Sequence, residues 1–493
     1  MPAPFPATDP LLQGAFAPLG IEYDHADLLI EGAFPRELDG VLYRIGPNAQ
    51  FAPRGPYNPL QGEGMIHAFD IRGGRVAYRN RWVRTRRWRL ERQAGRALYS
   101  TSDPRAHDPL VRGEPDEGAA NTHIIMHAGR LLALEEGHLP IEIVPDTLET
   151  RGSFDFGGRL RAPMTAHPKI CPQTGEMLFF SNFPDQAFDG ALLLHTVDPA
   201  GELTRSVRIA GPYPALVHDF AITRTRIVLV VCPLTISLER LRRGAPPIAW
   251  EPPRGAFVGM APRADPAAVQ WWPAPACMVW HVLNAFDEGD RVQLDLCSQA
   301  APAFPAADGT PPSQAALRQR LARWTVDPAA SAVAVRQLHD MTCEYPRIDE
   351  RRTGLPYRYG FVATLGGPGT GDLHHRGLAR HDHLTGQTEL WSAPPGHAVS
   401  EPVFVPRDPA AAEGEGHLLA TLYDEARDAS RLALFDAQAL AQGPIAAANL
   451  DHRVPAGFHG SFVPRGQLGD VRPGTPVHRP AARGSSGLDG PGA

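Results

Sequence analysis

Four histidines in this chain have apolar surroundings, where a neutral imidazole could serve as a metal ligand. They are His167, His218, His281 and His459, and each is flanked by apolar or aromatic residues. Such flanks predict burial, and a buried neutral imidazole needs a partner for each of its ring nitrogens. The four positions are spread over nearly 300 residues. They can form a metal site only if the fold brings them together, and the sequence alone does not show this.

Three glutamates, Glu135, Glu344 and Glu401, also lie in largely apolar stretches. A buried carboxylate is costly unless it accepts hydrogen bonds or balances a cation. A histidine that binds a metal usually donates its other ring N–H to such a group, which fixes the orientation of the ring. These glutamates are therefore candidates for supporting metal-binding histidines. The alternative is that they are exposed carboxylates at the ends of strands.

The remaining histidines offer no established metal motif, because the sequence contains neither HExxH nor CxxC. The densest clusters are His374-His375 and His381-Asp382-His383. Both stand in polar, turn-like sequence, so we interpret them as solvated loop residues.

Composition narrows the class of protein. The chain has 493 residues, of which 43% are hydrophobic and 21% charged, as is typical of a globular protein with a large core. A formal net charge of -6 argues against a nucleic-acid partner, which requires a basic surface. Five widely spaced cysteines are expected to be reduced. Residues 1–20 show no secretory pattern and no apolar run is long enough to span a bilayer, so we expect a cytoplasmic protein.

Short strands separated by turn residues dominate the chain and must position these side chains. Runs rich in Val, Ile, Leu and Phe include Arg130–Leu134, Glu176–Phe180, Arg226–Val231, Arg291–Leu296, Tyr359–Thr364, His417–Leu422 and Arg431–Phe435. Helical periodicity is limited to Ser237–Arg243 and Ser313–Arg323. So many short strands predict an all-β fold, and a β-propeller fits this length better than a sandwich.

The predicted organisation has three parts. An N-terminal arm covers residues 1–25, a single propeller domain covers residues 26–467, and a tail covers residues 468–493. The tail is dense in Gly, Pro, Arg and Ser and lacks apolar periodicity, so we expect it to be disordered.

The ordered series of motifs around the histidines resembles the carotenoid cleavage oxygenase family, which includes carotenoid and apocarotenoid oxygenases, stilbene-cleaving oxygenases and the retinal pigment epithelium isomerase. The resemblance runs from about residue 31 to residue 464. Its motifs are Glu31–Pro35, Leu38–Gly40, Arg44–Asn48, Gly62–His67, Asn121-Thr122, Ala166–Lys169, His218–Phe220, His281–Phe286, Glu401–Arg407 and Phe458–Gly460. Any one of these motifs alone is weak, but their shared order is highly specific.

The resemblance implies a seven-bladed β-propeller with one ferrous iron on its axis and O2 as co-substrate. The family's four ligands fall on His167, His218, His281 and His459, and its three supporting carboxylates fall on Glu135, Glu344 and Glu401. His67 belongs to a shared motif and is interpreted as structural. The implied reaction is oxidative cleavage of a conjugated C=C bond to two carbonyl products, without 2-oxoglutarate, flavin or haem.

The family's phenol-selective members use a lysine immediately before the first supporting glutamate, together with a tyrosine. Leu134 occupies that lysine position here, and Lys169 is the only lysine in the chain. Without a cationic partner a phenolate is not stabilised, which favours a carotenoid or apocarotenoid over a stilbene or phenylpropenoid. The pocket for substrate and O2 is expected to include Thr122, Leu134, Phe286 and Phe458.

A lipophilic polyene dissolves in membranes, so we expect a peripheral membrane contact through residues 233–250, which carry Leu234, Ile236, Leu238 and Leu241 together with Arg240, Arg242 and Arg243. A surface helix packed on the propeller is the alternative. No nucleic acid and no obligate protein partner are expected. A propeller that only binds a partner is a further alternative, because fold does not determine function.

Overall fold

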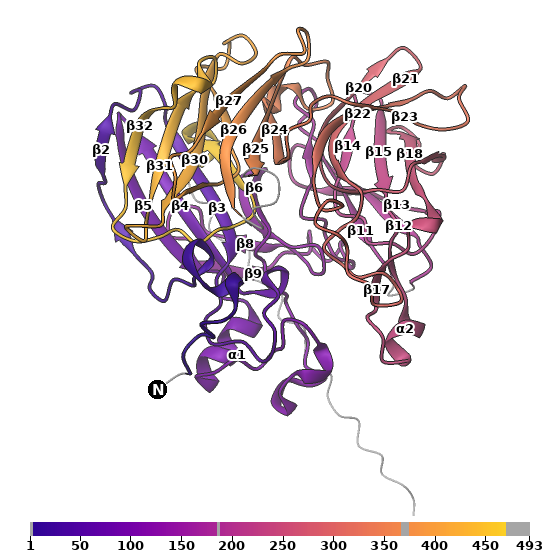
Figure 1. The fold of residues 1–493 in the computed structure, drawn as a ribbon, viewed down its shortest axis with the longest axis horizontal. Helices are drawn as coiled ribbons and strands as arrows, with labels where there is room; N and C mark the ends of the chain where they lie inside the picture. Colours follow the sequence, from indigo (N-terminus) through magenta and orange to yellow (C-terminus); the bar gives the residue numbers. More distant parts are fainter. Residues whose placement is uncertain (1–2, 185–187, 366–373, 470–493) are drawn as a thin grey trace, which may run out of the picture.

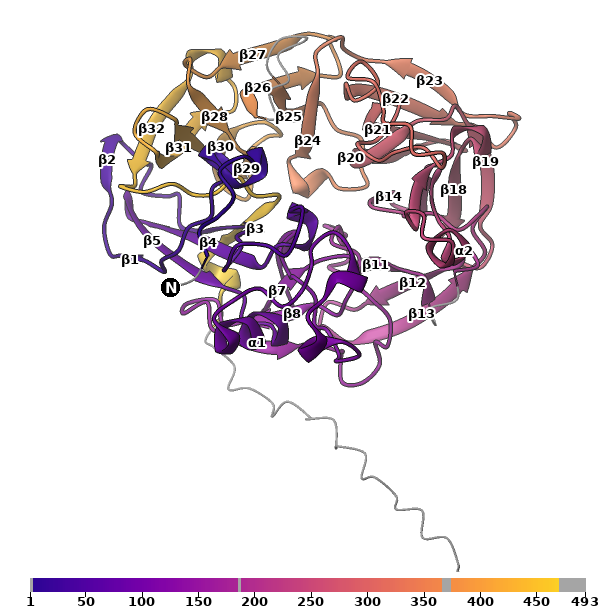
Figure 2. The same cartoon turned by 60° about the horizontal axis from the view of Figure 1, so that its bottom comes forward.

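The computed structural model describes residues 3–184, 188–365 and 374–469, and its strands form a ring of seven sheets around a central axis (Figures 1 and 2). The predicted seven-bladed β-propeller is thus confirmed. Each blade is an antiparallel sheet of at least four strands, as in other propellers.

Six of the blades are formed by strands that follow one another in the chain, apart from one strand of the sixth. The first contains β6 (His123–His127), β7 (Arg130–Leu134), β8 (Ile141–Ile143) and β9 (Thr150–Ser153). The second contains β10 (Lys169–Ile170), β11 (Met177–Asn182), β12 (Leu192–Val197) and β13 (Leu203–Ile209). The third contains β14 (Phe220–Ile222), β15 (Arg226–Val231), β18 (Ala256–Pro262) and β19 (Gln270–Ala274). The fourth contains β20 (Met278–Glu288), β21 (Arg291–Gln299), β22 (Arg320–Val326) and β23 (Ala334–Gln337). The fifth contains β24 (Cys343–Ile348), β25 (Tyr359–Leu365), β26 (His375–Asp382) and β27 (Thr388–Ser392). The sixth contains β28 (His397–Val399), β29 (Val403–Pro406), β30 (Gly416–Asp424), β31 (Ala429–Asp436), β32 (Pro444–Asn449) and β2 (Leu29–Gly32).

The seventh blade closes the ring, because it combines strands from both ends of the chain. Its order is β1 (Asp24–His25), β5 (Arg75–Trp82), β4 (Gly64–Arg72), β3 (Gly40–Pro47) and β33 (Gly460–Pro464). The innermost strand β33 pairs with β3 from Gly40↔Pro464 to Arg44↔Gly460. Early and late segments are therefore held together by backbone hydrogen bonds near the axis.

Apolar side chains pack between adjacent blades. One cluster joins β15 and β18 of the third blade to β20, β21 and β22 of the fourth, with Trp324 almost fully buried in it. Another joins the sixth blade to the closing blade through residues such as Leu42, Phe69 and Leu432. Inter-blade packing of this kind fixes the angle at which each inner strand faces the axis.

Each of the seven strand runs predicted from sequence coincides with an observed strand. The helix predicted at Ser237–Arg243 is α2 (Leu238–Arg242). The helix predicted at Ser313–Arg323 is wrong: residues 314–317 form a turn and β22 begins at Arg320. β22 pairs with β21 from Val292↔Val326 to Ser298↔Arg320, and the backbone hydrogen bonds and packing of this pairing stabilise a strand more than the local helical pattern stabilises a helix.

Loops and short helices cover one face of the ring. They include α1 (Arg86–Ala94), which begins at the capping side chain of Thr85, and an insertion made of β16 (Leu234–Ile236), α2 and β17 (Ile248–Trp250) (Figure 1). Single 3-10 turns occur at Pro10–Leu12, Gly14–Phe16, Pro59–Gln61, Pro104–Ala106, Pro109–Val111, Pro252–Arg254, Glu350–Arg352, Leu440–Gln442 and Arg465–Gln467. Among the described residues no helix is long and apolar enough to cross a bilayer. Residues 470–493 of the predicted tail lie outside the described residues.

Candidate metal centre

The histidines singled out from the sequence lie at the same end of the innermost strands. His167 precedes β10, His218 precedes β14, His459 precedes β33, and His281 lies near the start of β20. Each inner strand follows a connection from the outer edge of the preceding blade, so all inner strands run in the same direction along the axis. Residues at their starts therefore converge, although the sequence separates them widely.

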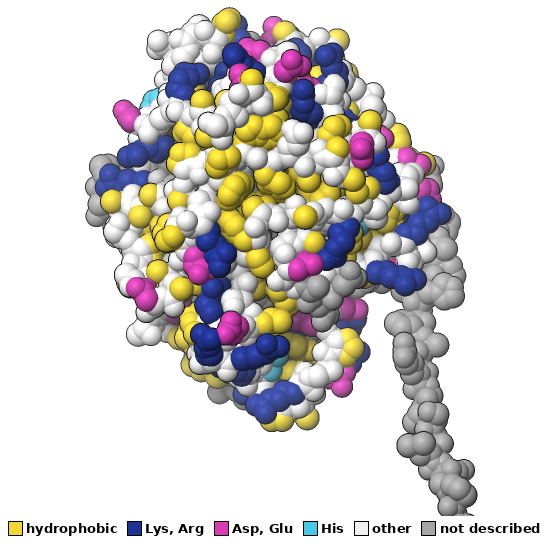
Figure 3. All heavy atoms as spheres, turned by 90° about the vertical axis from the view of Figure 1, so that its right-hand side faces the viewer, with side chains coloured by type: hydrophobic (Ala, Val, Ile, Leu, Met, Phe, Trp, Pro, Cys, Tyr) yellow, Lys and Arg dark blue, Asp and Glu magenta, His cyan; other side chains and the backbone are white. Residues whose placement is uncertain are grey.

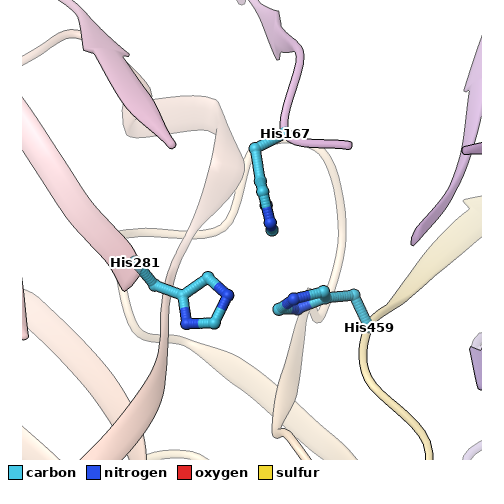
Figure 4. A group of neighbouring side chains, drawn as sticks. All are labelled: His167, His281 and His459. Carbon is cyan, nitrogen blue, oxygen red and sulfur yellow. The ribbon is translucent and has the colours of Figure 1, made fainter. Parts of the chain in front are cut away.

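The imidazoles of His167, His281 and His459 point toward one another, with one ring nitrogen of each within 4.8 Å of the others (Figure 4). The fourth histidine joins them: Nε2 of His218 lies 3.0 Å from Nε2 of His167 and 3.3 Å from Nε2 of His281. The structure thus brings all four predicted ligand residues together on the axis.

Three of these imidazoles are oriented by carboxylates. The Nδ1–H of His281 donates to Glu344 Oε2 at 2.6 Å, and the Nδ1–H of His459 donates to Glu401 Oε1 at 2.9 Å, as predicted for these two glutamates. The Nδ1–H of His218 donates to Glu136 Oε2 at 3.0 Å. A carboxylate partner fixes the tautomer, so that Nε2 faces the axis with its lone pair.

The prediction for Glu135 requires a correction by one residue. Its carboxylate pairs with Nδ1 of His138, and this pair raises the pKa of His138 even though burial alone would lower it. Strand β7 ends at Leu134, so both glutamates lie beyond the strand, where the alternation of side chains no longer applies. The sequence therefore could not determine which of them reaches His218.

Substituting these neighbouring glutamates separately tests the correction. We expect Glu136→Gln to weaken Fe2+ binding by about 10- to 100-fold, because removal of the charge behind His218 makes its Nε2 a poorer donor. Glu135→Gln, the matched control, should change the affinity by less than about twofold. Competition with a chelator of known affinity measures both, and the opposite ranking would restore Glu135 to the supporting role.

The donor set fits a divalent cation on chemical grounds. Because Nδ1 of His218 and of His281 both donate to carboxylates, their Nε2 lone pairs face each other across 3.3 Å. Two lone pairs at that distance repel unless a proton or a cation lies between them. Burial, reinforced for His167 by the surrounding histidines, holds the pKa of His167 and of His459 well below the ordinary value, whereas burial of His281 is outweighed by the Glu344 carboxylate, which raises the pKa of His281, whose proton a metal ion would displace. Neutral imidazoles with converging lone pairs are what a metal ion requires.

Asp219 connects three of the ligand-bearing segments. Its Oδ1 accepts hydrogen bonds from the backbone N–H of Phe220 at 2.7 Å and lies 2.7 Å from Nζ of Lys169, and its Oδ2 accepts the N–H of Val282 at 2.8 Å. Lys169, Asp219 and Val282 each stand within two residues of one of the clustered histidines. This buried carboxylate therefore sets the spacing between the second, third and fourth blades at the level of the cluster.

A cavity of about 680 Å3 extends from the histidine cluster along the inner strands as far as Pro464 at the end of β33. None of the four predicted pocket residues is among those that line it. Leu134 is fully buried in a cluster between the first two blades, and Phe286 lies five residues beyond His281 on β20, where it packs against Tyr357. Thr122 and Phe458 contact the site through their backbones: the Thr122 carbonyl accepts the N–H of His459 at 3.1 Å, and Phe458 flanks that histidine.

Several histidines in the two clusters that we interpreted as solvated loop residues are not solvated loop residues in the structure. His381 is 4% exposed on β26, and the His383 side chain is equally buried, so that cluster is not solvated. His375 begins β26, and its ring lies 5.0 Å from that of Tyr345, which in turn lies 5.6 Å from that of His281. Pairing of β26 between β25 and β27 determines this burial, and the polar sequence did not indicate it.

Sequence analysis missed His123, the first residue of β6. Its ring lies 5.3 Å from that of His459 and 5.8 Å from that of His167, and its Nδ1 lies 2.9 Å from the carbonyl oxygen of Ala166. Burial lowers the pKa of His123 to about 4. The available signal was the spacing of four between His123 and His127, but on a strand this spacing separates the two rings by too much for one metal.

Comparisons with known proteins agree with this geometry. The family model described as "Retinal pigment epithelial membrane protein" matches residues 16–464. An isoeugenol monooxygenase from Pseudomonas nitroreducens is 36% identical, over 93% of this chain and 98% of that protein. The crystal structure of a lignostilbene dioxygenase from Pseudomonas brassicacearum superimposes with a TM-score of 0.89 at 34% identity, over 94% of this chain and 100% of that one. The structure of a Trp149Ala mutant of the Synechocystis apocarotenoid oxygenase superimposes with a TM-score of 0.82 at 29% identity, over 91% of this chain and 97% of that one.

Proposed function

Because this chain belongs to the retinal pigment epithelial membrane protein family, which is the carotenoid cleavage oxygenase family that its motifs resemble, we propose that it is a non-haem Fe2+ enzyme that cleaves a phenylpropenoid or stilbene C=C bond. The relatives' names show an oxygenase-type enzyme rather than a propeller that only binds a partner. In the balanced reaction, both atoms of one O2 enter the products and the alkene becomes two carbonyl compounds.

The iron proposal rests on the imidazole nitrogens that converge on the axis. Three of the four imidazole rings are held by a hydrogen bond from Nδ1 to a carboxylate, which leaves Nε2 directed at the axis. Four neutral nitrogen ligands leave positions free on an octahedral ion. His167, His218, His281 and His459 would hold the iron, which supplies O2 activation when bound. Glu136, Glu344 and Glu401 balance its charge from outside the ligand set. The chain's own contribution is therefore to hold the imidazoles in one tautomer at fixed spacing.

The choice of substrate class differs from the carotenoid preference drawn from the sequence. Relatives named for isoeugenol, lignostilbene and resveratrol support the phenylpropenoid and stilbene alternative better. Leu134 is also not the residue that precedes the supporting glutamate: with Glu136 behind His218, the preceding residue is Glu135. Lysine is still missing there, and Lys169 is ion-paired with Asp219. We infer that a phenol binds in its neutral form, since no lysine is available to stabilise the phenolate.

Parallel assays on the iron-loaded protein test this proposal. We expect O2 uptake and aldehyde formation with isoeugenol and a 4-hydroxystilbene at a kcat/KM at least about tenfold above that for an apocarotenal, which corresponds to about 1.4 kcal/mol of transition-state discrimination. A 4-methoxystilbene is the matched control for the phenol. Cleavage of the apocarotenal alone would support a carotenoid substrate instead. Iron binding without O2 uptake in the presence of any of these compounds would contradict the oxygenase proposal.

We also propose a peripheral membrane contact at the α2 insertion. Leu238 and Leu241 are 38% and 36% exposed on this short helix. Apolar side chains form a broad band across the middle of the face shown in Figure 3, with basic side chains around the band and below it. Arg240 and Arg243 are ion-paired with Glu251 and Glu239, so attraction to a bilayer would depend more on the leucines than on charge.

Vesicle sedimentation tests this contact. We expect the double substitution Leu238→Ser and Leu241→Ser to reduce the fraction bound to phosphatidylglycerol-containing vesicles by about tenfold, because two exposed apolar side chains are lost. The control is Leu384→Ser, which removes a leucine that is 75% exposed in a turn elsewhere. Equal binding by the double variant and the wild type would exclude α2 as the contact.

A further inference from the structure

A second cluster of potential metal ligands lies far out in the closing blade. His25, Asp451 and His452 each offer one donor atom, and these atoms all lie within 4.8 Å of one another. His25 is on β1, the outermost strand of that blade, whereas the axial histidine His459 adjoins β33, the innermost (Figure 2). The cluster is therefore separate from the metal centre on the axis.

The protein leaves ring nitrogens in this cluster without partners. Nε2 of His25 and Nε2 of His452 are both inaccessible to solvent and have no hydrogen-bond partner among the described residues. Nε2 of His25 lies 3.8 Å from Oδ1 of Asp451, which is too long for a hydrogen bond. An unsatisfied buried polar atom destabilises a protein by about 1–3 kcal/mol, so such atoms require an explanation.

Aromatic packing holds the two imidazoles in place. The Tyr23 ring is stacked on that of His452 at 3.9 Å between centroids and on that of His25 at 5.5 Å. The centroids of the two imidazole rings are 5.5 Å apart, with an angle of 20° between their planes. Tyr78, which pairs with His25 across β1 and β5, completes the enclosure. Rings that are fixed in this way lose little side-chain entropy when they bind a ligand.

We propose that His25, Asp451 and His452 form a second site for a divalent transition-metal ion, with Zn2+ as the best-suited occupant. Two imidazole nitrogens and one carboxylate oxygen are ligands that Zn2+ accepts, and a water molecule completes four-coordination. The His452 Nδ1–H donates to Asp451 Oδ1 at 2.8 Å; when Nδ1 binds the metal, this proton moves to Nε2 as the imidazole changes tautomer, so the ring stays neutral and the carboxylate oxygen becomes available to the metal. Burial lowers the pKa of His452, which keeps its imidazole neutral near pH 7.

A metal ion here would tie the N-terminal arm to the segment that leads to the axis. The backbone N–H of Ala456 already donates to the carbonyl of Ala15 at 2.7 Å, and Nε of Arg453 donates to that of Ala17 at 3.0 Å. His25 ends the predicted arm and lies on β1, where the arm joins the closing blade, and Asp451 and His452 precede Arg453. The site therefore adds a cross-link beside these existing contacts, at His452, which stands seven residues before His459, and its role is to stabilise closure of the ring.

Equilibrium dialysis of the iron-loaded, full-length protein against micromolar Zn2+ tests the proposal, with zinc and iron measured in the same samples. We expect one zinc per chain in addition to the iron, and a Kd that is at least about 30-fold weaker in His25→Ala and in Asp451→Asn. The matched control is His397→Ala, because Nε2 of His397 lies 3.7 Å from Oδ2 of Asp424 without a second histidine in that pair. This control should bind zinc as the wild type does.

Thermal unfolding provides a second measurement that does not depend on activity. Zinc should raise the Tm of the wild type and of His397→Ala, but not that of His25→Ala, because a ligand stabilises only the state that binds it. The proposal is overturned if His25→Ala and Asp451→Asn bind zinc with wild-type affinity. It is also overturned if each zinc bound displaces one iron, because the zinc would then occupy the axial histidines.

Discussion

The His281→Ala variant is expected to lose iron and, with it, O2 uptake. His281 is the proposed ligand whose Nε2 lies 3.3 Å from that of His218 and whose Nδ1 is anchored by Glu344 at 2.6 Å. Removing it leaves three imidazoles and an unpartnered carboxylate. We expect Fe2+ affinity to fall by more than about 100-fold, beyond the 10- to 100-fold typical of losing an outer partner, and cleavage to fall below about 1% of wild type.

The measurement is iron per chain after anaerobic loading and desalting, followed by O2 uptake. The control is His195→Ala, which removes a histidine that is more buried than His281 but whose ring nitrogens contact Ser181 and Ser206. It should retain one iron per chain. Retention of wild-type iron affinity by His281→Ala would mean that the cluster is not the iron site.

Glu401→Gln is expected to destabilise the fold as well as the metal centre. Glu401 is 1% exposed, and its Oε1 lies 3.2 Å from Nη1 of Arg347 while its Oε2 lies 3.8 Å from Nη1 of Arg44. Its Oε2 also accepts the N–H of Gly460 at 2.9 Å. The substitution leaves the buried guanidinium of Arg44 without its charge partner and leaves Arg347 with only the exposed carboxylate of Glu350, for which we expect a loss of about 3–5 kcal/mol in the free energy of unfolding.

The ionisation of Glu401 determines where this effect is measured. Burial alone would raise the pKa of its carboxyl, but the Arg347 guanidinium and the His459 imidazole hold it well below the ordinary value. An acid with a lowered folded pKa contributes stability above its unfolded pKa, and that contribution is lost as the pH falls through the folded pKa. Urea unfolding of the iron-free protein at pH 7 therefore records the full effect.

Glu350→Gln is the matched control, because Glu350 also pairs with Arg347 but its side chain is 64% exposed. Exposed pairs contribute about 0–1 kcal/mol, so this variant should remain near wild type. If Glu401→Gln were no less stable than Glu350→Gln, the buried pairs would not hold the closing blade in place, and Glu401 would act on His459 alone.

Much of the protein could be predicted from local sequence. Strand runs such as Arg226–Val231 coincide with β15 because alternating or continuous apolar residues bounded by turns have few other stable arrangements. The four axial histidines were identifiable because each sits in an ordered family motif and in apolar sequence that indicates burial. Glu344 and Glu401 could be predicted to support histidines on similar grounds, since each lies in apolar sequence and a buried carboxylate needs a partner.

Other features depended on contacts between distant residues. Glu135 and Glu136 both follow the end of β7 in the first blade, and only the position of His218 before β14 of the third blade selects Glu136. Residues 320–323 carry a helical pattern but belong to β22, because β21 offers a full set of backbone partners. The carotenoid preference drawn from Leu134 assumed that Glu135 supports His218. Because Glu136 does so instead, Leu134 no longer bears on the substrate.

The sequence by itself determined which residue types are available, the order of the strands and the burial of most ligands, because these depend on side-chain chemistry and local periodicity. The tertiary structure decided which of these residues meet. Ring closure places His25 beside His452, although they lie near opposite ends of the described chain, and it places His123 against His459. Such contacts arise from the parallel arrangement of inner strands and from the pairing of β3 with β33, which no local pattern encodes.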